Sequence, residues 1–221
     1  MSWHASPDWR SATPAYRFLS LTARGPVRAL ARLQTKGLEH VPAAGPALVA
    51  SNHLSWADPI LINDAIPRPT YWMAKGDLFR NAAGRLAMGA FGCIKVDRES
   101  GGNEGAVSAA VRALGEGRVV GVFPEGTRSR PGQVRRGRTG VARIAALSGA
   151  PVVPLGIDTS SFWPRHVRLP RFGCRVRLVV GAPLRLDLKP ADAEDKQRMR
   201  DATDDIMERV KALLAEARAG W

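Results

Sequence analysis

The sequence contains few cysteines and few histidines, and none of them is spaced as a metal site requires. Its two cysteines, Cys93 and Cys174, cannot build a disulfide framework, and neither belongs to a Cys-x-x-Cys pair. The four histidines are scattered, with no cysteine or carboxylate at ligand spacing. We therefore expect two reduced thiols, no metal and no bound cofactor.

Long apolar runs are also missing. No stretch approaches the roughly 18 apolar residues of a membrane-spanning helix, and residues 1–14 lack the apolar core of a signal peptide. No repeat, low-complexity tract or linker divides the 221 residues, a length that suits one domain. We expect a protein that is either soluble or lies on a membrane.

Acidic residues are scarce relative to basic ones. The chain has 20 Asp and Glu against 33 Lys and Arg, which gives a net charge of +13 and a pI near 11.0. Such a protein should be drawn to polyanions, namely nucleic acid, an anionic membrane surface or phosphorylated substrates. Charge alone does not choose among these.

Short apolar runs and amphipathic segments alternate after residue 35. The pattern predicts strands at 47–51, 70–74, 93–96, 119–123, 152–157 and 175–180, the last at an edge or with one face exposed. It predicts helices at 58–64, with Asp58 as the N-cap, and at 77–89, 103–114, 139–147 and 192–219. Repeated strand–helix units indicate an α/β domain over 35–221 whose mostly parallel mixed sheet is flanked by helices.

The first 34 residues differ from the rest. On a helical wheel of 16–33, Arg17, Arg24, Arg28 and Arg32 share one face and apolar residues occupy the other. A basic amphipathic helix of this kind suits an anionic membrane surface. The alternative is a terminal helix that packs on its own domain, and Gly25-Pro26 could divide it into two shorter helices.

The strongest local motif follows the predicted strand at 47–51. It reads Asn-His-Leu-Ser-Trp-Ala-Asp, from Asn52 to Asp58. On one regular helix, His53 and Asp58 would point about 140° apart and could not meet. If the chain turns between strand and helix, the carboxylate can return to the imidazole and orient it as a general base. The alternative is that Asp58 only caps a helix.

Three further motifs follow strands. Residues 123–130 read Phe-Pro-Glu-Gly-Thr-Arg-Ser-Arg and bring guanidinium groups suited to phosphate, although a solvated basic loop would look the same. Residues 92–98 read Gly-Cys-Ile-Lys-Val-Asp-Arg, in which Lys95 and Arg98 could share an anion. Residues 153–157 read Val-Pro-Leu-Gly-Ile, whose Pro154 favours a strand end over a strand interior.

Taken together, the four motifs resemble those of the PlsC-like glycerolipid acyltransferase family, the 1-acylglycerol-3-phosphate (lysophosphatidate) acyltransferases. The resemblance covers about residues 35–185. It implies that His53 is the general base and Asp58 its orienting partner, and that Pro154 lines the acyl-donor side. The residues expected to contact the acceptor and its phosphate are Lys95, Arg98, Glu125, Gly126, Thr127, Arg128 and Arg138.

The resemblance implies a fatty acyl transfer from acyl-CoA or acyl carrier protein to the hydroxyl of 1-acylglycerol-3-phosphate, giving phosphatidic acid. The expected partners are a lysophospholipid acceptor, the acyl thioester and an anionic membrane surface, without nucleic acid. We expect peripheral attachment to the cytoplasmic face of a membrane. The family often carries a longer hydrophobic N-terminal helix pair, so the short arginine-rich segment leaves the mode of attachment open.

Other functions explain less of the sequence. A serine hydrolase should show Gly-x-Ser-x-Gly, and the chain has none. A non-catalytic basic protein that binds lipid or nucleic acid explains the charge but leaves His53, Asp58 and Glu125 without a role. Glycerol 3-phosphate or another lysolipid remains open as the acceptor. A covalent mechanism at Cys93 has no histidine nearby in the sequence to support it.

Overall fold

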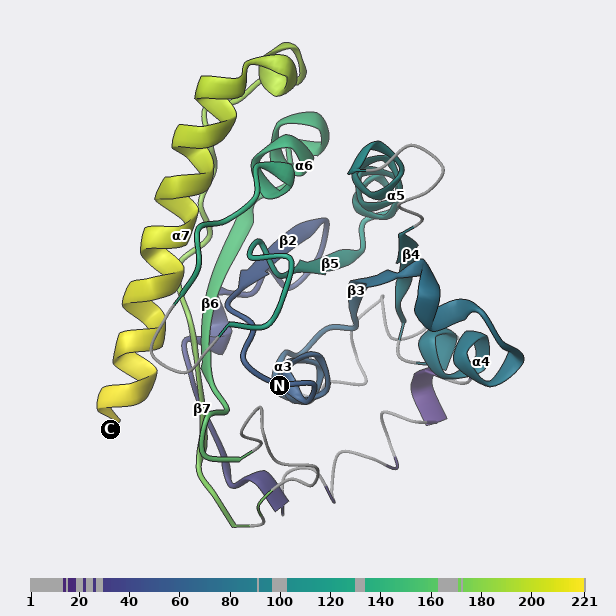
Figure 1. The fold of residues 1–221 in the computed structure, drawn as a ribbon. Coiled ribbons are helices and arrows are strands. Elements are labelled where there is room, and N and C mark those ends of the chain that lie inside the picture. The colour runs from purple at the N-terminus through teal and green to yellow at the C-terminus, as the bar shows by residue number, and fades with distance from the viewer. Residues whose placement is uncertain are drawn as a thin grey trace.

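A seven-stranded sheet forms the centre of the protein, with the strand order β1-β7-β6-β2-β5-β3-β4 (Figure 1). The fold comes from a computed structural model that describes residues 14, 16–18, 22, 26, 30–90, 92–96, 103–129, 134–162, 171 and 173–220. The strands are β1 (Leu33–Lys36), β2 (Ala47–Ser51), β3 (Thr70–Lys75), β4 (Ile94–Val96), β5 (Val119–Val122), β6 (Val152–Asp158) and β7 (Val176–Val180). All neighbours pair in parallel except β6 and β7, so the predicted mostly parallel mixed sheet is confirmed.

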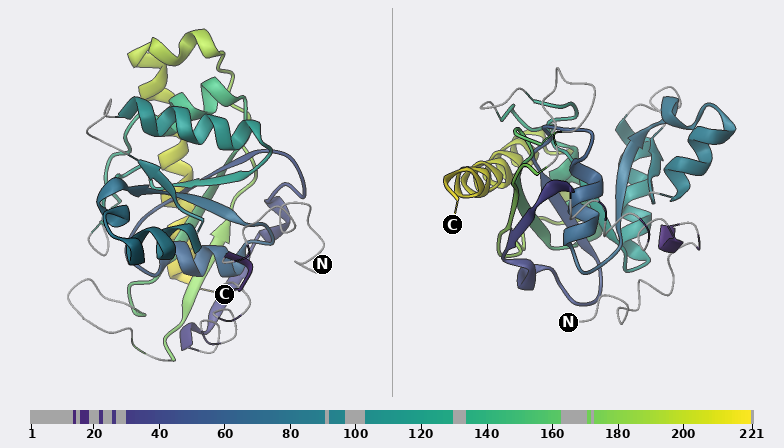
Figure 2. Two further views of the ribbon diagram at one scale, coloured as in Figure 1. Left: turned by 90° about the vertical axis from the view of Figure 1, so that its right-hand side faces the viewer. Right: turned by 90° about the horizontal axis from the view of Figure 1, so that it is seen from below.

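Helices cover both faces of the sheet. They are α3 (Asp58–Ala65), α4 (Ala82–Ala90), α5 (Asn103–Gly115), α6 (Gly140–Ser148) and α7 (Lys196–Ala219), with short 3-10 turns η2 (Leu38–His40), η3 (Gly76–Phe79) and η4 (Pro190–Glu194). Side chains of α3 pack on one face, and side chains of α5, α6 and α7 pack on the other. Helices α7 and α4 lie at opposite ends of the molecule (Figure 2).

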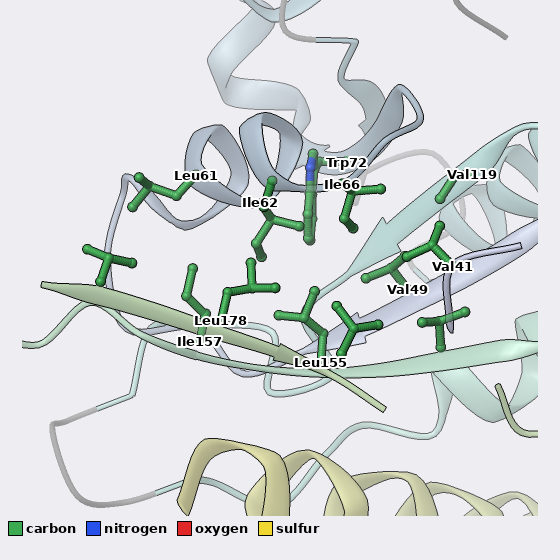
Figure 3. Packing of buried hydrophobic residues seen from close by; sticks show 14 of the residues in the cluster. Val41, Val49, Leu61, Ile62, Ile66, Trp72, Val119, Leu155, Ile157 and Leu178 are labelled. Carbon is green, nitrogen blue, oxygen red and sulfur yellow. The ribbon is translucent and has the colours of Figure 1, made fainter. Parts of the chain in front are cut away.

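The alternation along β2 divides the core into two layers. Ala47 and Val49 join the cluster under α3, while Leu48 and Ala50 join the cluster under α5 and α6. Every residue of β2 is buried, as expected of a central parallel strand covered on both faces. Figure 3 shows the first cluster between α3 and strands β6 and β7, with α7 beyond the sheet.

Helix α7 lies unusually close to β6. A Cβ added at Gly156 would come within 2.3 Å of the Leu214 amide nitrogen and 2.4 Å of the Leu213 carbonyl carbon. Backbone atoms cannot turn away as a flexible side chain can. Gly156 therefore sets how closely α7 can dock.

Helix α7 begins at a side-chain cap, since Asp195 accepts hydrogen bonds from the Gln197 and Arg198 amides, both at 3.0 Å.

Several predicted boundaries were wrong. The helix expected at 77–89 is divided into η3 and α4, because the Asn81 side chain accepts the Gly84 amide at 2.6 Å and starts a new helix there. Strand β7 is neither at an edge nor exposed on one face, since β1 pairs on its far side and none of its residues is exposed. The helix expected through residue 33 cannot reach it, because Arg32 has a φ of 36° and Leu33 begins β1.

The N-terminal segment falls mostly outside the described residues, so the amphipathic helix and the domain boundary at residue 34 stay predictions. Of the residues described there, Tyr16 is buried and its ring stacks with Tyr71, whereas Phe18 is largely exposed. Within the described part of the chain, no helix combines the length and apolarity needed to cross a bilayer.

Gly156→Ala should lower the free energy of unfolding by about 1–3 kcal/mol, because the added methyl group must push α7 away from β6. Gly105→Ala is the matched control, since a Cβ there meets nothing within 4 Å on α5. That change should be neutral or stabilise the protein by up to about 1 kcal/mol. Urea unfolding of both variants measures the difference, and equal stabilities would contradict the close docking of α7.

Candidate active site

The predicted return of Asp58 to His53 is confirmed by the geometry of the loop that links β2 to α3. The His53 Nδ1 atom lies 2.8 Å from Asp58 Oδ2. The same carboxylate oxygen accepts the amides of Leu54 at 2.7 Å and Ser55 at 2.8 Å. Asp58 is the first residue of α3 and not its N-cap as predicted, because Ala57 holds the cap position. Its carboxylate instead folds the loop back on itself.

This arrangement fixes the tautomer of His53. Because Asp58 Oδ2 accepts two backbone N–H groups, it carries no proton, so the His53 Nδ1–H must donate to it. The neutral ring then has its lone pair on Nε2. Asp58 is fully buried, while the His53 side chain keeps 16% of its surface exposed. The ring is therefore held at Nδ1 by a buried carboxylate, and part of the side chain stays exposed.

An aromatic stack supports the face of the imidazole. The His53 ring stacks on Phe123 at 4.0 Å between centroids, and Phe123 stacks on Trp72 at 4.4 Å. Trp72 is fixed by a hydrogen bond from its Nε1 to Asn63 Oδ1 at 3.1 Å. Gly121 makes room for it, because a Cβ there would come within 2.7 Å of the indole. Strands β3 and β5 thus set the plane of the His53 ring.

Asn52 fixes the start of the His53 loop. Its side-chain amide donates to the Ile157 carbonyl at 2.8 Å, and its carbonyl oxygen accepts the Ile157 amide at 2.9 Å. These two bonds imitate one more step of pairing between β2 and β6 after β2 has ended at Ser51. The side chain of Asn52 therefore holds His53 at the carboxyl edge of the sheet.

Glu125 connects the His53 loop to the loop after β5. The Glu125 carboxylate is buried, and its Oε1 accepts the His53 amide at 3.0 Å. Its Oε2 accepts the Ser129 hydroxyl and the Arg135 amide, the latter at 2.7 Å. The Ser129 amide in turn donates to the His53 carbonyl at 2.7 Å. With three protein donors, Glu125 positions both loops, and its predicted contact with the acceptor stays a prediction.

Basic side chains border this pair of loops. The Arg128 guanidinium lies over the Trp56 ring, 4.4 Å from the ring centroid, and Trp56 is 57% exposed three residues after His53. Arg138 passes beside Gly126, where a Cβ would come within 2.8 Å of the Arg138 Nε. Thr127, between Gly126 and Arg128 in the chain, is exposed. The structure thus places Gly126, Thr127, Arg128 and Arg138 in one region next to His53.

Other predicted residues lie elsewhere. Lys95 is on β4, and two strands, β5 and β3, separate β4 from β2. Arg98 lies outside the described residues, so its role stays a prediction. Pro154 is not at a strand end as predicted but inside β6, where it is buried and its carbonyl accepts the Gly181 amide. The missing N–H of Pro154 is tolerated because β7 ends at Val180. The expected contact of Pro154 with the acyl donor stays a prediction.

Cys93 does not have the properties of a nucleophile. Burial raises the pKa of the Cys93 thiol to about 11. At neutral pH the thiol therefore stays protonated, and the thiolate is the reactive form. This favours direct attack by an acceptor over a covalent enzyme intermediate.

Sequence reasoning missed several residues that hold the site together. Thr159 donates its hydroxyl to Asp58 Oδ1 at 2.7 Å, and Ser129 reaches Glu125. Phe123 and Trp72 support His53 although neither has a reactive group. Only Thr159 had a usable signal, because it directly follows β6, whose carboxyl end lies beside that of β2.

Comparisons with known proteins agree with this geometry. Residues 32–158 match the model of the family described as Acyltransferase. The 1-acyl-sn-glycerol-3-phosphate acyltransferase of Bacillus subtilis is 29% identical over 79% of this chain and 84% of its own length. The alpha form from Ovis aries is 30% identical over 73% of this chain, and the Borreliella burgdorferi enzyme is 29% identical over 59% of it. The chain spans only 57% and 53% of the length of these last two relatives.

A solved structure shares the fold. The crystal structure of the 1-acyl-sn-glycerophosphate (LPA) acyltransferase PlsC from Thermotoga maritima superposes with a TM-score of 0.70, covering 94% of this chain and 79% of that one at 24% identity. The matched family region contains β2, the His53 loop, β5 and β6, which build the site. This chain belongs to the acyltransferase family.

Proposed function

We propose that this acyltransferase moves a fatty acyl group from an acyl thioester to the free hydroxyl of 1-acylglycerol-3-phosphate, giving phosphatidic acid. The observation that carries the proposal is the His53–Asp58 pair, in a loop whose Trp56 contacts the Arg128 guanidinium. The names of the relatives support the same acceptor. The reaction needs no cofactor besides the thioester, because a thioester is already activated.

The chemistry follows from the tautomer of His53. Its Nε2 accepts the proton of the acceptor hydroxyl while that oxygen attacks the thioester carbonyl, and Asp58 stabilises the imidazolium that forms. The carbon–sulfur bond then breaks, and the leaving thiolate takes the proton back from Nε2. An ester and a free thiol are the products. Because the base returns to its starting state, one histidine is sufficient.

The acceptor phosphate is expected near Arg128. Its guanidinium lies over the Trp56 ring, so its charge has a fixed place before the substrate arrives. Arg138 borders the same loop and extends the basic region. Arg98 and Lys95 are included in the proposal only because they belong to the sequence motif at residues 92–98.

The acyl donor and the acceptor can be identified together. Purified protein is incubated with acyl-CoA or acyl carrier protein thioesters and a panel of acceptors that includes lysophosphatidate, glycerol 3-phosphate and other lysolipids. Mass spectrometry then reads the products. Lysophosphatidate should be acylated faster than the other acceptors, giving phosphatidic acid. Faster acylation of glycerol 3-phosphate would show that glycerol 3-phosphate is the acceptor instead.

His53→Ala should lower kcat by about 100-fold to 10,000-fold, since a positioned base contributes that much to proton transfer. The matched control is His40→Ala, because the His40 Nδ1 contacts the Val180 carbonyl at 2.9 Å at the end of β7, away from the site. Turnover is measured with lysophosphatidate, and circular dichroism checks the fold. A folded His53→Ala protein with wild-type turnover would refute the mechanism.

Arg128→Ala should raise the KM for lysophosphatidate by the equivalent of about 1.5–3 kcal/mol, the usual strength of a hydrogen bond to a charged group. The KM for the acyl thioester should change much less. Turnover of a monoacylglycerol that lacks the phosphate should also change much less. Arg112→Ala, on the exposed side of α5, is the matched control for lost charge. A change confined to the acyl donor would place the phosphate elsewhere.

We also infer that the protein works at an anionic membrane surface, on the cytoplasmic face. The net charge of +13 and the exposed Trp56 beside the site support this. The arginines of residues 16–33 are the second candidate contact. Either contact would hold the protein at the bilayer that contains the acceptor.

Binding to vesicles should depend on anionic lipid and weaken with salt, because each basic residue near such a surface contributes about 1 kcal/mol and salt screens that attraction. Co-sedimentation of the full chain and of a variant without residues 1–34 is compared at low and high salt. The truncated protein should sediment less. Equal binding by both would move the contact to the arginines around Arg135 and Arg138.

A further inference from the structure

Thr159 is a buried residue at the carboxyl end of β6, outside the four sequence motifs. Its side chain is fully buried, and its hydroxyl donates to Asp58 Oδ1 at 2.7 Å. This is the second oxygen of the carboxylate that holds His53. The two residues lie 101 positions apart in the chain, yet β6 pairs directly with β2, the strand that delivers His53.

The two oxygens of Asp58 have very different surroundings. Oδ2 accepts from His53, Leu54 and Ser55, which all belong to the loop that follows β2. Among the hydrogen bonds described for Oδ1, the only donor is Thr159. A buried carboxylate oxygen without a donor is costly, and the group can rotate to share the remaining donors. The hydroxyl of Thr159 is therefore placed to oppose such a rotation and to keep Oδ2 directed at His53.

The turn after β6 fixes Thr159 itself. Asp158 Oδ1 accepts the amide of Ser160 at 3.1 Å and its hydroxyl at 2.6 Å. The Thr159 carbonyl accepts the amide of Phe162 at 3.1 Å, and Phe162 packs in the core under α3. With its backbone held on both sides, Thr159 can orient Asp58 and does not simply follow it.

We propose that Thr159 is a positioning residue for acyl transfer, which keeps the Asp58 carboxylate in the orientation that holds the His53 Nδ1–H and leaves Nε2 ready to accept a proton. It acts through Asp58 and touches neither substrate. The proposal rests on the function proposed above, because it assigns Thr159 to the same base.

Thr159→Val removes the hydroxyl and keeps the shape of the side chain. We expect kcat to fall about 10-fold to 100-fold, the factor that a hydrogen bond to a charged group contributes. The KM values for both substrates should stay near those of the wild type, since no binding contact is lost. Thr159→Ser restores the donor and should recover most of kcat.

Thr70→Val is the matched control. Thr70 is also fully buried and its hydroxyl donates to the Arg68 carbonyl at 3.4 Å, but it lies at the amino end of β3, away from the site. Its kcat should equal that of the wild type. Wild-type kcat in a folded Thr159→Val protein would overturn the proposal, and so would equal losses of kcat in the valine and serine variants.

A second measurement does not depend on turnover. In proton NMR, the His53 Nδ1–H bonded to a carboxylate gives a signal at low field. That signal should move to higher field or disappear in Thr159→Val and persist in Thr159→Ser and Thr70→Val. An unchanged signal in Thr159→Val would overturn the proposal. If the wild-type protein turned over no phosphorylated acceptor, the proposed function would fail, and this signal would still decide the role of Thr159.

Discussion

The buried carboxylate of Asp58 is the constraint around which the active edge is arranged. A carboxylate without solvent needs a donor for each oxygen, and here the donors come from the loop after β2 and from the end of β6. The two backbone donors force the loop to turn back, which brings His53 to the carboxylate although the two residues are five positions apart in the chain. The same bonds make Oδ2 the acceptor for the His53 Nδ1–H and so decide which nitrogen of His53 stays free. The local fold and the chemistry therefore have one cause.

The parallel sheet supplies the rest of the arrangement. Because β2, β5 and β6 run in the same direction, their carboxyl ends meet at one edge and deliver His53, Glu125 and Thr159 together. Glu125 ties the loops after β2 and β5 through three hydrogen bonds to its buried carboxylate, and the stack of Phe123 on Trp72 supports the imidazole face. Few of these contacts involve a reactive group. They hold one ring in place, beside the Arg128 guanidinium that lies over Trp56.

The sequence predicted the class of fold, most elements and the pairing of His53 with Asp58, because strand-end motifs in an alternating pattern indicate one edge of a parallel sheet. It could not predict contacts that depend on which strands are neighbours. Thr159 reaches Asp58 only because β6 lies beside β2, and β7 is interior only because the unpredicted β1 pairs with it. Glu125 looks like a binding residue in sequence, yet its partners are two backbone amides and a hydroxyl, which no local pattern reveals. Pro154 suggested a strand end because proline lacks the N–H that a strand interior requires. It is accommodated inside β6 because β7 ends beside it, and this register depends on the tertiary structure.

The tautomer of His53 tests this account most directly. In protein labelled with nitrogen-15 at histidine, long-range proton–nitrogen spectra distinguish a protonated ring nitrogen from one with a free lone pair, and His53→Gln assigns the signals among the four histidines. The account predicts that the neutral His53 ring carries its proton on Nδ1, with Nε2 unprotonated, and that Asp58→Ala abolishes this preference. A neutral ring protonated on Nε2 in the wild-type protein would contradict it, because that nitrogen could then accept no proton from an acceptor hydroxyl.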